Sequence, residues 1–119
     1  GKKGRRKISV DGENFLWYVA PDDESAYQIV HIISEDKKLV LAVPLKMPSD
    51  YVISKGQVFQ GRKTQGTWER YRLPVSMPEA VTPSVVSELV RWSVNGESAE
   101  PVLWDEHGDY YMIYGYHSR

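Results

Sequence analysis

The chain has 119 residues, of which 41% are hydrophobic and 26% are charged, so one globular domain is expected, and disordered, collagen-like and coiled-coil classes are excluded. The absence of cysteine excludes a disulfide framework, a thiolate metal site and a cysteine nucleophile. The formal net charge is −1, yet residues 1–7 carry five cations and no acid, which predicts a flexible basic tail on an acidic domain spanning residues 8–119.

The hydropathy pattern indicates neither a membrane segment nor an export signal. A membrane helix needs roughly 18 to 20 consecutive apolar residues, and the longest apolar run here is residues 39–43. The first residues are basic where a secretory signal would be apolar, although the glycine at position 1 leaves a removed leader open. We therefore expect a cytoplasmic protein that does not interact with membranes.

The first predicted elements are two strands joined by a tight turn. Residues 7–10 alternate polar and apolar side chains, and residues 15–19 also have the composition of a strand. Asp11 and Gly12 lie between them, and this pair is typical of a two-residue hairpin turn, because both positions need a positive φ. The sequence therefore predicts an N-terminal β-hairpin.

A second hairpin and a less regular segment follow. Residues 27–33 are rich in β-branched side chains, residues 35–38 form a polar turn, and residues 39–45 predict the returning strand. Proline and glycine interrupt residues 46–66, for which the sequence predicts no firm structure. Residues 68–75 alternate again and predict a fifth strand.

The clearest helix is predicted for residues 83–95. Thr82 suits the N-cap and Pro83 suits the first helical position. Asn95 and Gly96 mark the end of the helix. One side of this segment is apolar, so we expect that side to pack on a sheet. The apolar residues are Val85, Val86, Leu89, Val90 and Trp92.

A terminal hairpin is predicted from residues 101–104 and 110–116, with a polar turn at residues 105–109. Its second strand carries a stripe on one face that consists of Tyr110, Met112, Tyr114 and Tyr116. We expect this stripe to be the sheet face beneath the helix. The alternative is a binding groove lined by Tyr110, Tyr114 and Tyr116, because tyrosine combines an apolar ring with a polar group.

Strands and helix are segregated along the chain, and this order predicts an α+β fold. We expect a mostly antiparallel, curled sheet of five to seven strands with one main helix, at about residues 83–95, packed on it.

Motifs for catalysis, nucleotides or metals are weak. Residues 56–64 approach a phosphate-binding loop, but one extra residue before Lys63 turns the lysine away from the phosphates. The acidic cluster in residues 105–109 lacks the spacing of zinc or calcium sites. The three histidines lie in three different elements, and we expect His31 to be a half-buried core residue. We therefore expect no cofactor, no metal and no identifiable catalytic residue.

A basic and aromatic segment is the strongest indication of nucleic-acid binding. Residues 62–72 interleave cations with aromatic rings, which is the composition that phosphate contacts and base stacking require. The candidate residues are Arg62, Lys63, Trp68, Arg70, Tyr71 and Arg72. The alternative is an edge strand whose outward arginines prevent edge pairing. Nucleic-acid binding is favoured if Lys63, Arg70 and Arg72 lie on the same side as an exposed Trp68, and it is disfavoured if these cations scatter.

Residues 81–96, together with residues 7–12 and 15–17, resemble small uncharacterised bacterial proteins. The shared features are a tryptophan-bearing N-terminal hairpin and a late helix that begins at Thr-Pro and ends at Asn-Gly. The resemblance implies a bacterial, cytosolic, single-domain protein of unknown function, and it provides no catalytic residue to carry over.

Three functional hypotheses follow from the sequence. The first is a small non-catalytic protein that binds a protein partner or regulates one, because the chain is rich in aromatic residues and its body is acidic. The alternative is a nucleic-acid-binding protein that uses residues 62–72. The third is an enzyme whose carboxylates or histidines meet only in the fold. The oligomeric state is left open.

Overall fold

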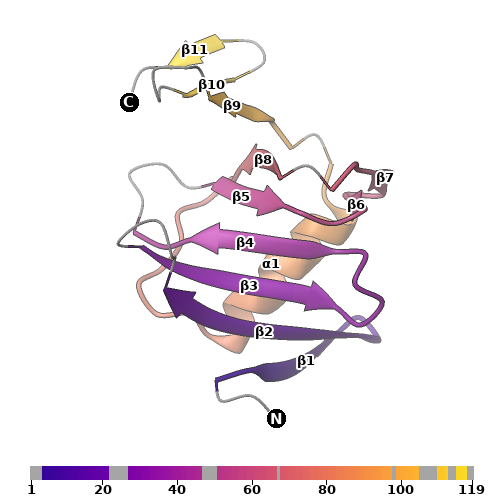
Figure 1. The fold of residues 1–119 in the computed structure, drawn as a ribbon. Helices are drawn as coiled ribbons and strands as arrows, with labels where there is room; N and C mark the ends of the chain where they lie inside the picture. Colours follow the sequence, from indigo (N-terminus) through magenta and orange to yellow (C-terminus); the bar gives the residue numbers. More distant parts are fainter. Residues whose placement is uncertain are drawn as a thin grey trace.

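The computed structural model describes residues 4–21, 27–46, 51–66, 68–97, 99–104, 110–112 and 115–117. Its main unit is a six-stranded antiparallel sheet in the order β1-β2-β3-β4-β5-β8, with α1 across one face (Figure 1). The elements are β1 (Arg6–Val10), β2 (Glu13–Pro21), β3 (Gln28–Ser34), β4 (Val40–Pro44), β5 (Tyr51–Ser54), β8 (Glu69–Arg72) and α1 (Pro83–Asn95). The predicted α+β class and the mostly antiparallel sheet are confirmed.

Two smaller sheets complete the described part of the chain. One pairs β6 (Val58–Phe59) with β7 (Arg62–Lys63), and the other consists of β9 (Val102–Trp104), β10 (Tyr110–Met112) and β11 (Gly115–His117). The residues just before β9 pair with β8. Tyr71 forms a β-bridge with Pro101, and the Arg72 amide donates to the Glu100 carbonyl at 2.8 Å.

The terminal strands correct one expectation. Residues 110–116 were predicted as one continuous strand beneath the helix, but β10 and β11 are separate strands that pair with each other. Tyr111 lies opposite Tyr116 in this pairing, and the strands belong to a sheet other than the one that α1 covers. Tyr110, Met112 and Tyr116 therefore do not belong to the sheet that α1 covers. Tyr114 and the acidic residues 105–109 lie outside the described residues.

The first hairpin forms as its turn sequence predicts. Asp11 and Gly12 have φ values of 50° and 83°. A type I′ two-residue turn requires a positive φ at both of its central residues. Strand β1 begins at Arg6, so Arg6 and Lys7 pair with Trp17 and Leu16 instead of lying in the basic tail. The predicted tail is shortened because the alternating pattern continues into the basic residues.

The turn between β3 and β4 is held by one hydroxyl and one carboxylate. The Ser34 hydroxyl donates to Asp36 Oδ1 at 2.7 Å and accepts from the Leu39 amide at 2.9 Å. The Lys38 amide also donates to Asp36 Oδ1, at 3.0 Å. The Ser34 hydroxyl, followed by this amide, lowers the pKa of Asp36 from its ordinary value. Lys37 adopts a φ of 63°, which closes the turn.

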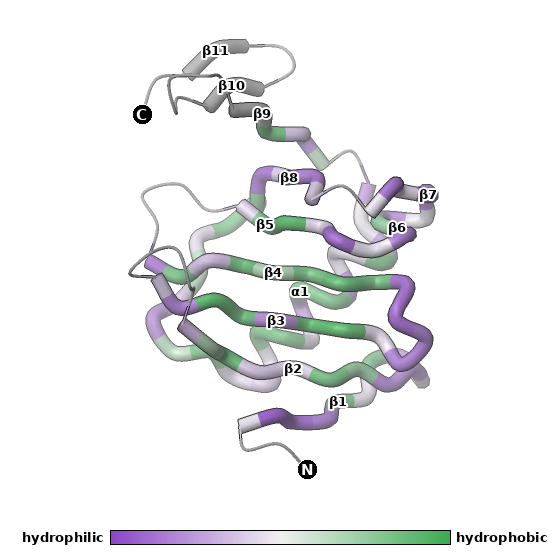
Figure 2. Tube along the Cα trace, viewed as in Figure 1, coloured by the Kyte–Doolittle hydropathy of each residue, from purple (hydrophilic) through white to green (hydrophobic). Residues whose placement is uncertain are grey.

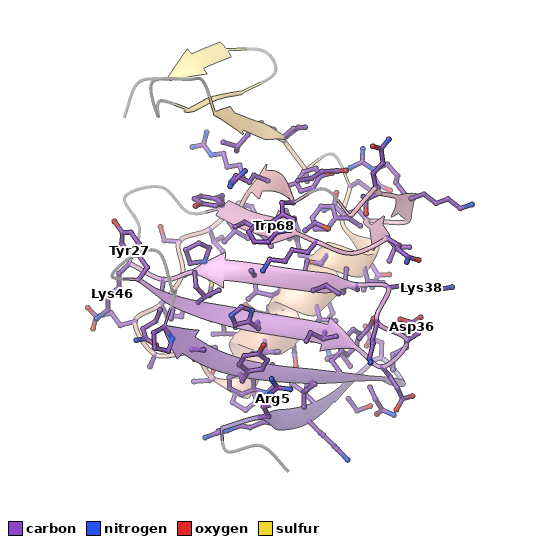
Figure 3. The ribbon with its side chains drawn as sticks, in the orientation of Figure 1. Arg5, Tyr27, Asp36, Lys38, Lys46 and Trp68 are labelled. Carbon is purple, nitrogen blue, oxygen red and sulfur yellow. The ribbon has the colours of Figure 1, made fainter. Side chains whose placement is uncertain are left out.

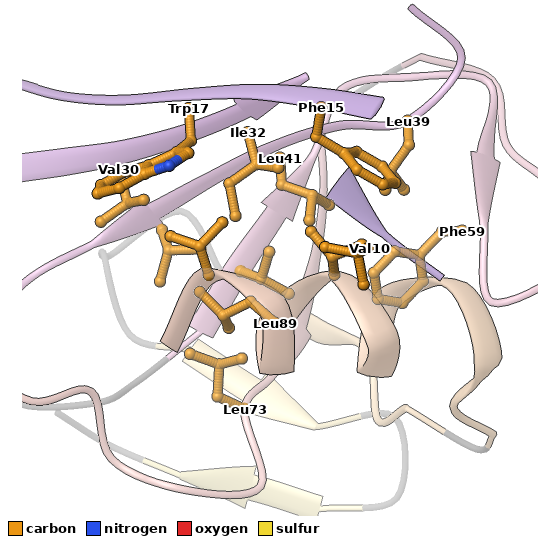
Figure 4. Close-up of a cluster of buried hydrophobic side chains, with 14 of the residues drawn as sticks. Val10, Phe15, Trp17, Val30, Ile32, Leu39, Leu41, Phe59, Leu73 and Leu89 are labelled. Atoms are coloured by element: carbon orange, nitrogen blue, oxygen red, sulfur yellow. The ribbon is translucent and has the colours of Figure 1, made fainter. Parts of the chain in front are cut away.

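Helix α1 begins and ends where the sequence predicts. Thr82 caps its N-terminus by accepting from the Val85 amide at 3.3 Å, and Pro83 occupies the first turn. Its buried residues are Val86, Leu89, Val90 and Ser93. Val86, Leu89 and Val90 pack against the inward side chains of the sheet, such as Trp17 and Leu41, to form the main core (Figure 4). This burial is the main stabilising contribution to the fold.

The end of α1 is held by the tip of the β6–β7 hairpin. Gln60 is nearly buried, and its side chain donates to the Trp92 carbonyl at 3.1 Å and accepts from the Ala99 amide at 3.2 Å. Its backbone amide donates to the Ser93 carbonyl at 2.7 Å. The Ser93 carbonyl is one that a helix C-terminus leaves without an intrahelical partner, whereas the Trp92 carbonyl also accepts from the Gly96 amide at 2.9 Å. The irregular middle of the sequence therefore has a definite structural role.

In the described part of the chain, no helix is both long enough and apolar enough to cross a membrane. The hydrophobic residues concentrate instead in the centre of the sheet, in β3 and β4, and the hydrophilic residues concentrate in the turns (Figure 2).

Candidate binding site on the helix-free sheet face

The sheet has a second face, which α1 does not cover. Strand alternation places on it the odd-numbered residues of β1, β3 and β5 and the even-numbered residues of β2, β4 and β8. Ile29, Ala42 and Ile53 are buried there in a cluster separate from the main core, with Tyr51 packed against them. We call this surface the helix-free face.

A single row of side chains crosses this face. Cross-strand pairing aligns, in order, Tyr18, His31, Ala42, Ile53 and Arg70. The Tyr18 and His31 rings are stacked, with centroids 4.7 Å apart and planes 17° apart. The Arg5 guanidinium lies 4.6 Å from the centroid of the Tyr18 ring, which extends the row to β1. The row is therefore aromatic near β2 and β3 and cationic at both ends.

Trp68 lies at the other end of the face, beside β5 and β8. Its side chain is 55% exposed, and Figure 3 shows it over β5 on the side away from α1. Lys55 Nζ lies 4.2 Å from the centroid of the tryptophan ring, a cation–π geometry. Trp68 has a φ of 56°, a conformation that residues other than glycine seldom adopt. The backbone thus holds a large apolar side chain in solvent at some conformational cost.

The charged residues at the described strand positions of this face are all cations. Its cations are Arg5, Lys7, Lys55, Arg70 and Arg72. No aspartate or glutamate occupies a described strand position on this face, because Glu13 and Glu69 alternate to the helix side. A chain with a net charge of −1 thereby presents a locally positive surface.

The fold separates the six residues of the predicted basic and aromatic site. Trp68, Arg70 and Arg72 lie on the helix-free face, whereas the nucleic-acid hypothesis required Lys63 on the same side as well. Arg62 and Lys63 are exposed on the separate β7 strand. The six residues therefore do not form one patch.

Tyr71 is a core residue rather than a binding residue. It is 6% exposed, and its ring stacks on Phe59 with centroids 4.3 Å apart. Its hydroxyl donates to Glu69 Oε2 at 2.6 Å. Burial, followed by this carboxylate, raises the pKa of Tyr71 to about 12. Alternation along β8 explains the correction, because Tyr71 must face away from both arginines.

The sequence alone did not identify Tyr18 and Lys55 as site residues. Tyr18 lies far from residues 62–72 in the chain and reaches the face through strand pairing, whereas Lys55 follows β5, which pairs with β8. The detectable signal for Tyr18 was the alternation in β2, which separates it from its buried neighbour Trp17. His31 is half-buried, as predicted, but it lies on the helix-free face.

Other parts of the described surface hold no comparable set of groups. A hollow of about 350 Å³ includes Lys46 and Glu79, and an apolar hollow of about 240 Å³ lies between α1 and residues 73–78. Among the residues that the structure describes, no three histidine, aspartate or glutamate side chains gather where they could hold a metal ion. The helix-free face is therefore the strongest candidate site.

The fold and this face define a class of protein: an α+β domain with a helix against one side of an antiparallel sheet and a cationic, aromatic surface on the other. No protein-family model, curated protein or solved structure was found to match the chain. The resemblance to small bacterial proteins, the bacterial origin and the cytoplasmic location stay predictions.

Proposed function

We propose that the protein is a binding protein that recognises an anionic macromolecule through the helix-free face. The observation that carries the proposal is the charge of this face: its described strand positions carry Lys7, Arg70 and Arg72 and no acid, and Arg5 and Lys55 lie over its exposed rings. Such a surface attracts a polyanion and increases its rate of association.

The composition of the face also supports binding. Tyrosine, tryptophan and arginine are enriched in recognition surfaces, because each combines a large contact area with a polar or charged group. Tyr18, Trp68 and Arg72 provide all three types here, and half-buried apolar residues such as Ile33 lie between them. Contacts of this kind add affinity to the electrostatic attraction.

Retention on a heparin column tests the proposal. The double variant Lys7→Gln, Arg72→Gln removes one cation at each edge of the face, and both side chains are exposed, so the fold is expected to be retained. We expect it to elute at lower salt than the wild-type protein, because each ionic contact contributes to the salt dependence.

The matched control is Arg62→Gln, Lys63→Gln, which removes the same two residue types from β7, outside the face. We expect this variant to elute close to the wild-type protein. Equal shifts for both double variants would show only a response to net charge, and the proposed site would then be wrong.

A second candidate function is binding of a protein partner through the apolar hollow between α1 and residues 73–78. It is favoured by Val75, which is 68% exposed, and by the lining residues Met77, Leu89 and Trp92. Val75→Asn is expected to weaken such binding and to leave heparin retention unchanged, because it makes the hollow more polar without changing the net charge, so the two candidate functions are separable.

A further inference from the structure

We propose that the ligand of the helix-free face is a single-stranded nucleic acid, whose bases stack on Trp68 and on the Tyr18–His31 pair while its phosphates contact the surrounding cations. This inference rests on the proposed function and specifies its ligand. It follows from where charge and aromatic rings lie relative to one another.

The cations lie toward the two sides of the face, and the rings and apolar residues lie between them. Arg5 and Lys7 are at the β1 edge, whereas Arg70 and Arg72 are on β8, the last strand of the sheet. Adjacent strands are about 4.8 Å apart, so the five intervals from β1 to β8 separate these groups by roughly 24 Å. A site of this width suits a strand of about four or more nucleotides.

The aromatic groups have the properties that base stacking requires. Trp68 is largely exposed, and the Tyr18–His31 pair is half-buried on the same face. Bases stack on tyrosine, tryptophan and histidine rings and on guanidinium planes, with little dependence on sequence. Arg5 and Lys55 lie over the Tyr18 and Trp68 rings, so a base that stacks there displaces the cation, which then lies close enough to contact the adjoining phosphate.

The arrangement disfavours a duplex and an acidic peptide. A duplex presents phosphates outward and keeps its bases stacked inside, so the apolar centre formed by Leu16, Ile33 and Val40 would face phosphate groups. An acidic peptide would pair with the cations but would not need planar rings. Only a ligand with both exposed bases and a charged backbone uses every part of the face.

Fluorescence anisotropy of the full chain with labelled oligo(U) and oligo(dT) of about 12 nucleotides tests the inference. We expect binding to both, with affinity that falls steeply between about 50 mM and about 200 mM salt. The double variant Lys7→Gln, Arg72→Gln should reduce the slope of log affinity against log salt by about 1.4, since each phosphate contact contributes about 0.7 on single strands. The control Arg62→Gln, Lys63→Gln should keep the wild-type slope.

Tryptophan fluorescence provides a readout that is specific to stacking. Among the tryptophans whose side chains the structure describes, Trp68 is the most exposed, and Trp17 is 4% exposed in the core, so oligonucleotide stacking should quench the Trp68 emission. Trp68→Asn should lose this quenching and about tenfold or more in affinity. Asparagine tolerates the left-handed backbone, so this variant is expected to fold. Val75→Asn, at an exposed apolar site outside the face, should bind as the wild-type protein does.

The competitors separate this inference from the proposed function. Displacement by unlabelled oligonucleotide, with weak displacement by duplex DNA and by poly-glutamate, supports both. If poly-glutamate displaces the labelled oligonucleotide equally well, or if Trp68→Asn binds it as the wild-type protein does, base stacking is overturned. The proposal that the face binds a polyanion would remain. Tighter binding of the duplex would also overturn the single-strand inference. Binding of none of these probes, and no retention on heparin, would overturn both.

Discussion

Neighbouring residues of β8 have opposite environments because strand side chains alternate. Arg70 and Arg72 lie on the helix-free face, while Tyr71 between them packs on Phe59 in the core. A segment that looks like one basic and aromatic patch in the sequence is thus divided between two faces. At the scale of single residues, the consequences are clearest for the titration of Tyr71 and for the packing of Gly96.

The high-pH stability of the protein is expected to depend on Tyr71. Its pKa is raised from 10.0 to about 12, chiefly by burial, so the folded state keeps a proton that the unfolded chain releases. The stabilisation is therefore fully present below pH 10 and is lost as the pH rises through about 12. Urea unfolding across this range should show a falling free energy of unfolding.

Tyr71→Phe is expected to remove this component of the pH dependence. At neutral pH the variant should lose only about 1 kcal/mol, because the ring still packs and one hydrogen bond, to Glu69, is lost. Tyr18→Phe, on the other face, is the control. Its free energy of unfolding should still fall at high pH, because Tyr71 is intact. A wild-type decline that persists in Tyr71→Phe would contradict the assignment.

Gly96 is required for space rather than for an unusual backbone angle. Its φ is −67°, which any residue adopts, but a Cβ there would collide with the Trp92 carbonyl and lie 2.6 Å from Gln60 Nε2. Gly96→Ala should therefore lower the free energy of unfolding by about 1–3 kcal/mol, as overpacking does. Chemical denaturation measures the loss, and Asn95→Ala, at the exposed neighbouring position, should change stability much less.

At the scale of elements, the β6–β7 hairpin caps the C-terminal end of α1. Gln60 and Gly61 have φ values of 51° and 72°, so the hairpin turns tightly and its tip reaches the end of the helix. There the Gln60 side chain and amide contact carbonyls of α1. The β6–β7 hairpin, for which the sequence predicts no firm structure, thereby caps the end of α1, the helix that the sequence predicts most clearly.

Gln60→Asn tests this capping. Asparagine accepts the left-handed backbone but is too short to reach both the Trp92 carbonyl and the Ala99 amide. We expect a loss of about 1–3 kcal/mol in unfolding free energy from the unsatisfied groups, and faster hydrogen exchange at the Gly96 amide. Gln57→Asn, with an exposed side chain, should leave both quantities unchanged. Unaltered exchange in Gln60→Asn would argue against the cap.

Element prediction succeeded where a few adjacent residues decide the structure. The Asp11–Gly12 turn and the Thr82–Pro83 helix start were predicted because local backbone angles and capping determine them. The terminal hairpin was predicted only in part, since β10 and β11 split one expected strand. A period-2 pattern indicates extended backbone, but it does not show where a strand bends back.

At the scale of the whole molecule, the two faces of the sheet differ in role. The inward face and α1 form the main core, which contains Ile32 at 0% exposure. The outward face keeps a smaller cluster and leaves Ile33 half-buried. Substitutions on the inward face should therefore mainly affect stability, and substitutions on the outward face should mainly affect binding.

The adjacent isoleucines of β3 test this division. Ile32→Thr is expected to destabilise the protein by about 2–4 kcal/mol, because it leaves a cavity and a buried hydroxyl in the core. Ile33→Thr should lose about 1 kcal/mol or less, because its side chain is partly in solvent. Chemical denaturation of both variants compares them directly, and equal losses would contradict the two-faced arrangement.

The sequence by itself determined the class of fold, the first hairpin, the bounds of α1 and the concentration of cations and aromatic residues in residues 62–72. Only the tertiary structure decided that Arg5 lies over the Tyr18 ring, that Lys55 lies over the Trp68 ring, and that Tyr71 is buried. Turns and caps depend on neighbours within a few residues, whereas membership of a face depends on strand order and on which side the helix packs. Those choices follow from burial of apolar surface over the whole chain.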